Sequence, residues 1–269
     1  MNRIDSAFRR LQAIGRKAFM PFLTAGDPSF DATTAILREL ERRGAADLIE
    51  LGIPFSDPLA DGPVIQASFQ RALDAHARPQ AAFEMMEKLR AEGMNLPVCM
   101  MVSYSLVFKA GPDAFAARAQ KAGIDGFIVP DLPVDEGQAF GKTLAKLGLK
   151  QVLLVTPATT PARRRLILDR STGFVYCVSL TGITGERAEL PPDLVDYVNG
   201  VKREAKTPVC VGFGIARPEQ VAMVAKVADG VIVGSAIVRH IDGCGAKSAE
   251  ALAKSVGEFC EKLSAPLRA

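Results

Sequence analysis

A glutamate interrupts an apolar run, and a proline-rich loop with further carboxylates follows it. Glu50 lies within "LIEL" (48–51), and the loop "GIPFSDPLADGP" adds Asp57 and Asp61. Burial would raise the pKa of such a carboxyl and suit it to exchange protons near neutral pH. A second carboxylate in a different environment separates the acid role from the base role. The residues therefore predict acid–base chemistry. A structural ion pair with a lysine or arginine is the alternative for Glu50.

The loop itself favours a functional role. It is longer than most connections between a strand and a helix, and its prolines restrict its conformers. Asp27, in "AGDPS", is one more acid near the start of the chain. Asp27 and Asp57 both precede proline, which is also common in ordinary turns. Asp61 could likewise be a turn residue, but it can reach back toward Glu50.

Glycine-rich segments recur late in the chain. They are "LTGITGER" (180–187), "GFGIARPEQ" (212–220) and "GSAIVRHI" (234–241), and each follows an apolar, strand-like run. Gly234 and Ser235 open a short apolar helix, whose amino terminus favours an anion. Barrel enzymes commonly bind phosphate with loops in these positions. The pattern predicts a phosphorylated substrate.

Short apolar runs alternate with helix-period segments from end to end. The helical segments include 31–43, 112–122, 136–147 and 218–227. The strand-like runs are residues 19–24, 48–51, 98–102, 127–129, 152–155, 174–179, 209–211 and 231–233. Eight such units predict a (β/α)₈ TIM barrel, an α/β fold, with a doubly wound open sheet as the alternative.

The two ends of the chain fit one continuous barrel. "MNRIDSAFRRLQ" has an amphipathic pattern and predicts an additional N-terminal helix, about Ile4–Ala13, against the base of the barrel. No linker or shift in composition divides the chain. We therefore expect one TIM-barrel domain over residues 1–269.

An internal repeat places the glutamate more closely. "GAADLIEL", "AGIDGFIV" and "KVADGVIV" share a helix end, an aspartate and then apolar positions. Aligned on that aspartate, Glu50 occupies the position of Ile128 and Ile232. The glutamate replaces a core residue near the carboxyl end of a strand, where barrel enzymes carry their chemistry. The shared aspartates are Asp47, Asp125 and Asp229.

Composition excludes several classes of protein. Lysine and arginine total 33 against 30 acidic residues, so charge gives no reason to expect a nucleic-acid partner. The basic run Arg163–Arg165 fits the solvated face of a helix. The five cysteines form no CxxC pair, and His76 and His240 suggest no ligand set, so we expect no metal site. Without a signal-peptide core or a membrane-length apolar run, a cytoplasmic protein is expected.

The stretch "IELGIPFSDPLADGP" resembles the signature of the tryptophan synthase alpha chain family. The resemblance extends to "PFLTAGDP" (21–28), "GIDGFIVPDLPVDE" (123–136), "LTGITG" (180–185), "GFGI" (212–215) and "GSAIV" (234–238). It implies a lyase of tryptophan biosynthesis. In that family, indole-3-glycerol phosphate is cleaved by retro-aldol chemistry to indole and glyceraldehyde 3-phosphate, without a cofactor. Indole passes to a pyridoxal-phosphate beta chain in an alpha2beta2 complex, which joins it to serine.

The resemblance also assigns roles to residues. Glu50 is expected to protonate indole C3 and to take the proton from the glycerol hydroxyl. Asp61 is expected to hold the indole N–H, and Thr184 to position Asp61. The other implied substrate-binding residues are Phe22, Tyr176, Gly185, Phe213, Gly214, Gly234 and Ser235. The expected docking site for the beta chain comprises Phe55, Asp57 and Pro58.

Three positions depart from the family pattern, and two other functions stay open. Ser103, Ser105 and Leu180 stand where a tyrosine, an asparagine and an arginine are common. These departures affect the pocket wall and the docking face. The alternative functions are another phosphosugar TIM-barrel isomerase or synthase, and a non-catalytic activator of a partner chain. An activator should have lost Glu50 or Asp61, and both are present.

Overall fold

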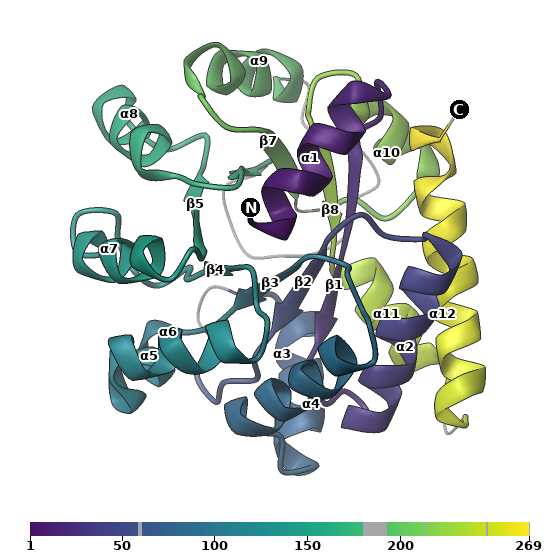
Figure 1. Cartoon of the computed structure of the whole chain (residues 1–269). Coiled ribbons are helices and arrows are strands. Elements are labelled where there is room, and N and C mark those ends of the chain that lie inside the picture. Colours follow the sequence, from purple (N-terminus) through teal and green to yellow (C-terminus); the bar gives the residue numbers. More distant parts are fainter. Residues whose placement is uncertain (59–60, 180–192, 213, 246, 269) are drawn as a thin grey trace.

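A closed parallel barrel forms the centre of the molecule (Figure 1). The computed structural model describes residues 1–58, 61–179, 193–212, 214–245 and 247–268. The strands are β1 (Ala18–Thr24), β2 (Ile49–Gly52), β3 (Val98–Met101), β4 (Gly126–Ile128), β5 (Lys150–Val155), β6 (Val175–Val178), β7 (Val209–Gly212) and β8 (Gly230–Val233). They pair in chain order, and β8 returns to β1 with Ile232 opposite Met20. The barrel prediction is confirmed, and the open sheet is wrong.

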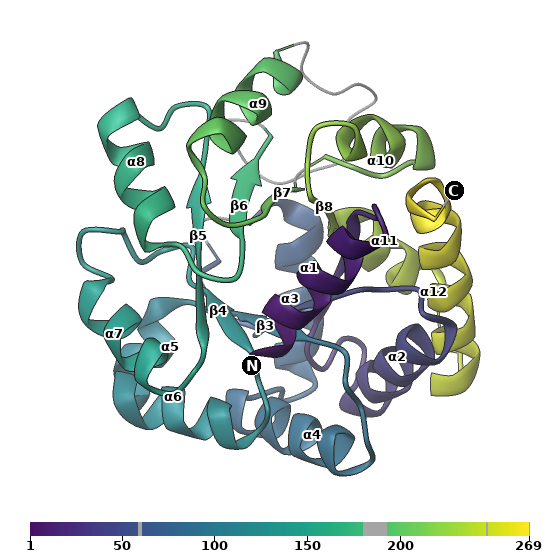
Figure 2. The ribbon, with the colours of Figure 1, turned by 45° about the horizontal axis from the view of Figure 1, so that its top comes forward.

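Helices surround the barrel (Figure 2). They are α1 (Arg3–Ala13), α2 (Phe30–Arg43), α3 (Pro63–Asp74), α4 (Pro79–Ala91), α5 (Tyr104–Ala110), α6 (Pro112–Lys121), α7 (Gln138–Lys146), α8 (Pro161–Arg170), α9 (Leu194–Glu204), α10 (Pro218–Ala225), α11 (Ser235–Gly243), α12 (Ala249–Ser264) and a 3₁₀ turn, Ala265–Leu267. Among the helices that the described residues form, none has the length and apolar character to cross a membrane.

Local sequence signals set the ends of the helices. The Ser29 hydroxyl accepts a hydrogen bond from the Ala32 amide and opens α2, and Gly44, at φ 60°, ends it. Proline begins α3, α4, α6, α8 and α10, where its missing N–H costs nothing. These signals explain why predicted and observed helix ends differ by only a few residues.

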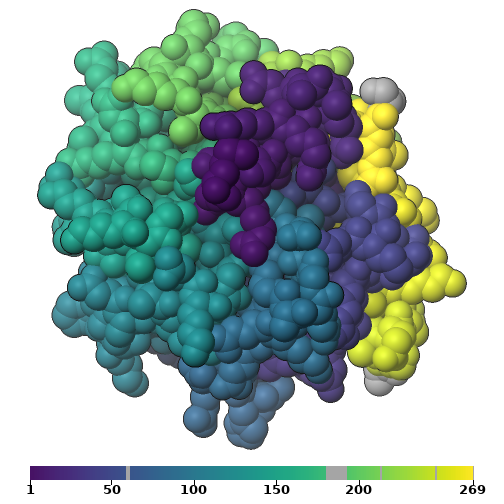
Figure 3. All heavy atoms as spheres, viewed as in Figure 1, coloured from purple at the N-terminus to yellow at the C-terminus, as the bar shows by residue number. Residues whose placement is uncertain are grey.

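The predicted N-terminal helix is confirmed as α1, and the N-terminal residues lie on the face of the molecule seen in Figure 3, where they are purple. Its residues Ile4, Phe8 and Leu11 join the cluster that fills the barrel interior. The rings of Phe8 and Phe174 lie 5.9 Å apart. Because α1 contacts residues such as Ala18 and Phe174 at the starts of strands, it closes the amino-terminal end, the base. The opposite end, the mouth, stays available for chemistry.

The three aspartates of the internal repeat all lie at the base. Each precedes a strand and accepts a hydrogen bond from a backbone amide of the strand before it. Asp47 accepts from the Phe19 amide at 3.0 Å and pairs with Arg16 at 3.1 Å. Asp229 accepts from the Val209 amide at 3.0 Å. It also pairs with Lys202 at 2.8 Å. The repeat is therefore a structural one, which joins neighbouring strands where they begin.

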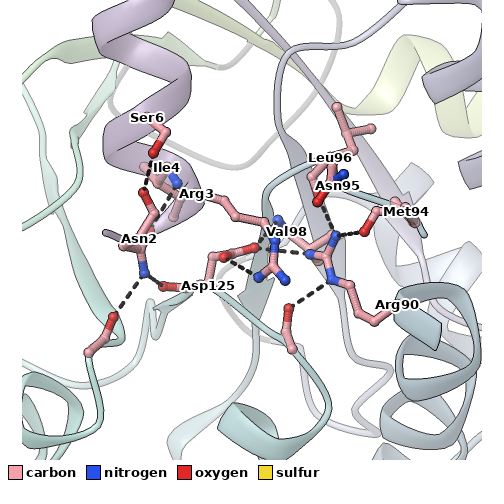
Figure 4. A network of polar contacts seen from close by, with 12 residues as sticks. Asn2, Arg3, Ile4, Ser6, Arg90, Met94, Asn95, Leu96, Val98 and Asp125 are labelled. Carbon is pink, nitrogen blue, oxygen red and sulfur yellow. Dashed lines mark hydrogen bonds and ion pairs between the residues drawn. The ribbon is translucent and has the colours of Figure 1, made fainter.

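Asp125 makes the most extensive of these contacts (Figure 4). Its carboxylate accepts from the Val98 amide at 2.9 Å and from Arg3 and Arg90 at 3.0 Å each. The Asn2 side chain donates to the Asp125 carbonyl at 2.8 Å. Through these bonds the start of α1 is fixed to β3 and β4.

Candidate active site

Glu50 lies in β2 at the mouth and is nearly completely buried. It is opposite Phe22 of β1 and Cys99 of β3, and 4% of its surface is exposed. Its Oε2 atom has no hydrogen-bond partner among the described residues. Within that part of the chain, no lysine or arginine forms an ion pair with it, so the structure does not support the ion-pair alternative. Burial, and then the charge of Asp61, raises the pKa of Glu50 to about 8.

Asp61 is held just before α3 by backbone contacts on both sides. Its amide donates to the Pro58 carbonyl at 3.1 Å, and its own carbonyl accepts from the Gln66 side chain at 2.8 Å. Burial, and then the charge of Asp131, raises the pKa of Asp61 to about 6. At neutral pH Glu50 therefore keeps its proton while Asp61 is ionised. Two interacting carboxyls in different states provide an acid and an acceptor within one site.

A cavity of 370 Å³ opens beside Asp61. Its walls are mostly apolar, with carboxylates at the edge. The lining residues are Ile53, Phe55, Asp57, Pro58, Asp61, Phe69, Met101, Val102, Ser103, Ser105, Pro130 and Asp131. A cavity of this size and character accommodates a flat aromatic ring with a polar group directed at a carboxylate.

Two strand-end glycines make room for the aromatic side chains of the site. A Cβ atom on Gly52 would lie 2.5 Å from Cζ of Phe22, and one on Gly212 would lie 2.8 Å from Cζ of Tyr176. Both distances are too short for real atoms, so each glycine is required for its aromatic neighbour. Burial, and then Glu50, raises the pKa of Tyr176, which keeps the phenol protonated. Sequence reasoning missed the packing role of both glycines, although a glycine inside a buried strand often marks a close approach.

Sequence reasoning also missed Asp131, which follows β4. Its carboxylate accepts from the Ser103 hydroxyl at 2.6 Å and from the Tyr104 amide at 2.8 Å. Ser103 and Ser105, the two positions where the resemblance led us to expect a tyrosine and an asparagine, both line the cavity. The only signal for Asp131 was its place in "PDLP" after a strand, a motif that is also common in turns.

The other two candidate acids have different environments. Asp27 is buried, and both its oxygens accept from Arg71, at 2.9 and 2.8 Å. It is a structural carboxylate at the mouth. The Asp57 carboxylate accepts from the neighbouring Ser56 hydroxyl at 2.7 Å and lines the cavity.

The amino terminus of α11 lies beside β1. Gly234 precedes the helix, and its Cβ position would be 3.5 Å from Cβ of Phe22. The first amides of a helix have no acceptor within it, so Ser235 begins a natural anion site. Gly214, after β7, has φ +75°, which glycine adopts without strain. Thr184, Gly185, Phe213 and Leu180 lie outside the described residues. In the part of the chain that is described, no group of three metal-binding side chains occurs.

Fold and site together define a class: a TIM-barrel enzyme with two buried, interacting carboxyls at the mouth and glycine-rich strand ends. Comparison with known proteins specifies the family. The family model described as "Tryptophan synthase alpha chain" matches residues 8–267. The chain belongs to this family.

Individual relatives agree over nearly their whole length. The chain is 44% identical to the tryptophan synthase alpha chain of Rhodopirellula baltica, with 98% of each chain covered. It is 43% identical to that of Carboxydothermus hydrogenoformans, with 90% of each covered. The solved alpha subunit of Legionella pneumophila superposes with a TM-score of 0.90 at 36% identity, covering 100% of this chain and 99% of that one. A chain of the tryptophan synthase complex from Pyrococcus furiosus gives 0.84 at 37% identity, covering 93% and 99%.

Proposed function

We propose that this protein cleaves indole-3-glycerol phosphate to indole and glyceraldehyde 3-phosphate, as a lyase of tryptophan biosynthesis. The family supports the reaction. The single observation that carries it at the site is the buried Glu50 carboxyl, whose Oε2 atom lacks a hydrogen-bond partner among the described residues and whose pKa is raised by the charge of Asp61. Such a group is costly for folding and fits proton transfer.

The protonation states give an order of steps. Glu50, protonated at neutral pH, gives its proton to indole C3. The ionised Asp61 carboxylate accepts the indole N–H and stabilises the positive charge that this transfer creates on the ring. The adjacent glycerol hydroxyl then loses its proton to the Glu50 carboxylate. The carbon–carbon bond breaks, its electron pair restores the aromatic indole, and the hydroxyl carbon becomes the aldehyde.

Three further groups would hold the substrate. Phe22 and Tyr176 would contact the indole and its reacting carbon from β1 and β6. The phosphate would bind amides at Gly214, Gly234 and Ser235, since the amino terminus of α11 favours an anion. The roles proposed for Thr184, Gly185 and Phe213 rest on the family resemblance alone. No cofactor or metal is required by these steps.

The direct test is release of indole from indole-3-glycerol phosphate by the purified chain. Asp61→Asn should lower the rate roughly 10²- to 10⁴-fold, the usual contribution of a charged group at a reacting centre. Titration with glycerol phosphate should shift the amide signals of Gly214, Gly234 and Ser235. An isomerase or synthase would release no indole, and a non-catalytic activator would be indifferent to Asp61→Asn.

We also propose that the chain works with a beta chain in an alpha2beta2 complex. Related structures from Pyrococcus furiosus are described as a tryptophan synthase complex and as the a2b2 complex. The proposed docking residues Phe55, Asp57 and Pro58 line the cavity at the mouth, so a partner seated there would lie directly over the site. Residues 1–269 would act as one domain, in the cytoplasm.

A further inference from the structure

A hollow on the outer side of α11 is bordered by basic side chains. It has a volume of 780 Å³ and lies between α11, α12 and the start of α10. The lining residues are Ala216, Arg217, Ala236, Arg239, His240, Gly243, Cys244, Lys247, Ser255 and Phe259. Three of them carry a full positive charge, and none carries a carboxylate. Since the chain as a whole has 33 basic and 30 acidic residues, this α11–α12 pocket departs clearly from the average.

One face of α11 provides much of the pocket. Ala236, Arg239, His240 and Gly243 are spaced by three, one and three residues, which places them on the same side of a helix. Val238 points the other way and packs in an apolar cluster with Phe22. The same helix therefore presents an apolar side to the mouth and a basic side to the pocket.

The floor of the pocket is polar and well fixed. The His240 ring stacks on Phe259 with centroids 4.4 Å apart and planes 5° apart. Its Nε2 atom lies 3.0 Å from the Ser255 hydroxyl, and the Cys244 sulfur lies 3.5 Å from the same oxygen. A hydroxyl and a ring nitrogen are thus held in place beneath the basic side chains.

We propose that the α11–α12 pocket binds a small phosphorylated anion, at a site separate from the phosphate position at the amino terminus of α11. Arginine offers a planar pair of donors to phosphate oxygens, and lysine adds a point charge. Arg217, Arg239 and Lys247 supply these groups at the rim, and Ser255 adds a hydroxyl at the floor. Since none of the described lining residues is a carboxylate, these residues add no repulsion against an anion. The proposal does not depend on the reaction proposed above.

The two histidines of the chain make the test specific. His240 lines the pocket, and His76 does not. In the free protein, burial lowers the pKa of His240, and the charges of Lys247 and Lys262 act in the same direction. Adding inorganic phosphate should therefore shift the His240 ring signals saturably and raise its pKa, because a bound anion favours the imidazolium form. His76 should not respond, and chloride at equal ionic strength should not reproduce the effect.

Variants assign the response to the pocket. Arg239→Ala with Lys247→Ala should weaken phosphate binding roughly tenfold or more for each charge-assisted hydrogen bond lost. Both residues are exposed, so the variant should fold. Lys254→Ala removes an exposed charge from α12 that does not line the pocket, and it should bind as the unmodified chain does. A response equal with chloride, a response kept in the double variant, or amide shifts at Gly234 without any at His240 would overturn the proposal.

Discussion

The base and the mouth of the barrel treat buried carboxylates in opposite ways. At the base, Asp125 accepts from an amide and from two guanidinium groups. At the mouth, an oxygen of Glu50 is buried without a partner among the described residues. The first arrangement compensates the loss of water, and the second leaves it uncompensated. Carboxylates at the base therefore hold strands together, whereas the one at the mouth has the environment that the proposed proton transfer requires.

Both situations occur within four residues around the start of β2. Asp47, just before the strand, has a raised pKa because burial outweighs its bond to the Phe19 amide and the charge of Arg16. Glu50 also feels burial first, but the next contribution is the negative charge of Asp61, which raises its pKa further. Burial is common to both ends. The sign of the neighbouring charge makes the difference.

The largest expected effect comes from removing the proton-transfer group. Glu50→Gln should lower the rate of indole release roughly 10²- to 10⁴-fold, because the amide cannot donate and recover a proton. The rate constant under saturating substrate measures this directly. A variant that kept more than about a tenth of the rate would contradict the role of Glu50.

The same substitution, Glu50→Gln, should increase stability relative to the wild type as the pH rises. Burial raises the pKa of Glu50 from its ordinary value of 4.5 to about 8 in the folded protein, so the folded state holds the proton more tightly than the unfolded state. Wild-type stability from this group is full below the lower value and declines as the pH rises from about 4.5 to about 8. Glu50→Gln lacks this decline. Urea unfolding at several pH values should show its relative stability increasing with pH, and an equal difference at all pH values would contradict the protonation state.

At the base, the same kind of change should cost stability and leave the chemistry intact. Asp125→Ala leaves Arg90, whose side chain is 10% exposed, without its carboxylate partner. Breaking a buried pair from one side costs roughly 3–5 kcal/mol. Urea unfolding measures the loss, and the rate per folded molecule should stay near that of the wild type. Asp169→Ala, which removes an exposed partner of Lys206, is the matched control and should change little.

Sequence alone predicted the barrel and the buried strand position of Glu50, because both depend on local pattern. Eight apolar runs determine the strand count, and a glutamate in a position that its repeats fill with isoleucine is visible without coordinates. Asp131 and the packing roles of Gly52 and Gly212 were missed because they depend on which side chains meet across the mouth. Asp27 was ambiguous for the same reason, since its partner Arg71 is distant in sequence.

A partner protein should raise the activity by docking at the mouth, and substitutions at the base should not affect this rise. The loop with Asp57 and Pro58 lines the cavity, so a docked beta chain would favour closure over the site and exclude water. We expect weak activity of the chain alone and a rise of about tenfold or more with beta chain. The reason is that the closed, active conformation of the loop is sparsely populated without the partner, which limits the rate. Pro58→Ala or Asp57→Ala should lose that rise, and Asp125→Ala should keep it. Full activity of the chain alone, unchanged by beta chain, would contradict this role of the loop.

The smallest effect should come from removing the charge of Asp131, which lines the edge of the cavity. The pKa values of about 6 for Asp61 and about 8 for Glu50 predict a bell-shaped pH dependence of kcat/KM with limbs near these values. Asp131→Asn removes a negative charge that raises the pKa of Asp61, so the acid limb should move to lower pH. Because Asp131 is exposed, solvent screens its charge and the shift should stay below about one pH unit.

Ser103→Ala provides the matched control for that shift. It removes the hydroxyl that donates to Asp131 at 2.6 Å but leaves the charge in place, and the Tyr104 amide still holds the carboxylate. Its acid limb should therefore move less than that of Asp131→Asn. The basic limb reflects Glu50, whose carboxyl interacts with Asp61 and Tyr176 rather than with Asp131. It should stay nearly constant in both variants. An acid limb that does not move in Asp131→Asn, or one that moves to higher pH, would show that the charge of Asp131 does not reach Asp61. The raised pKa of Asp61 would then be due to burial alone.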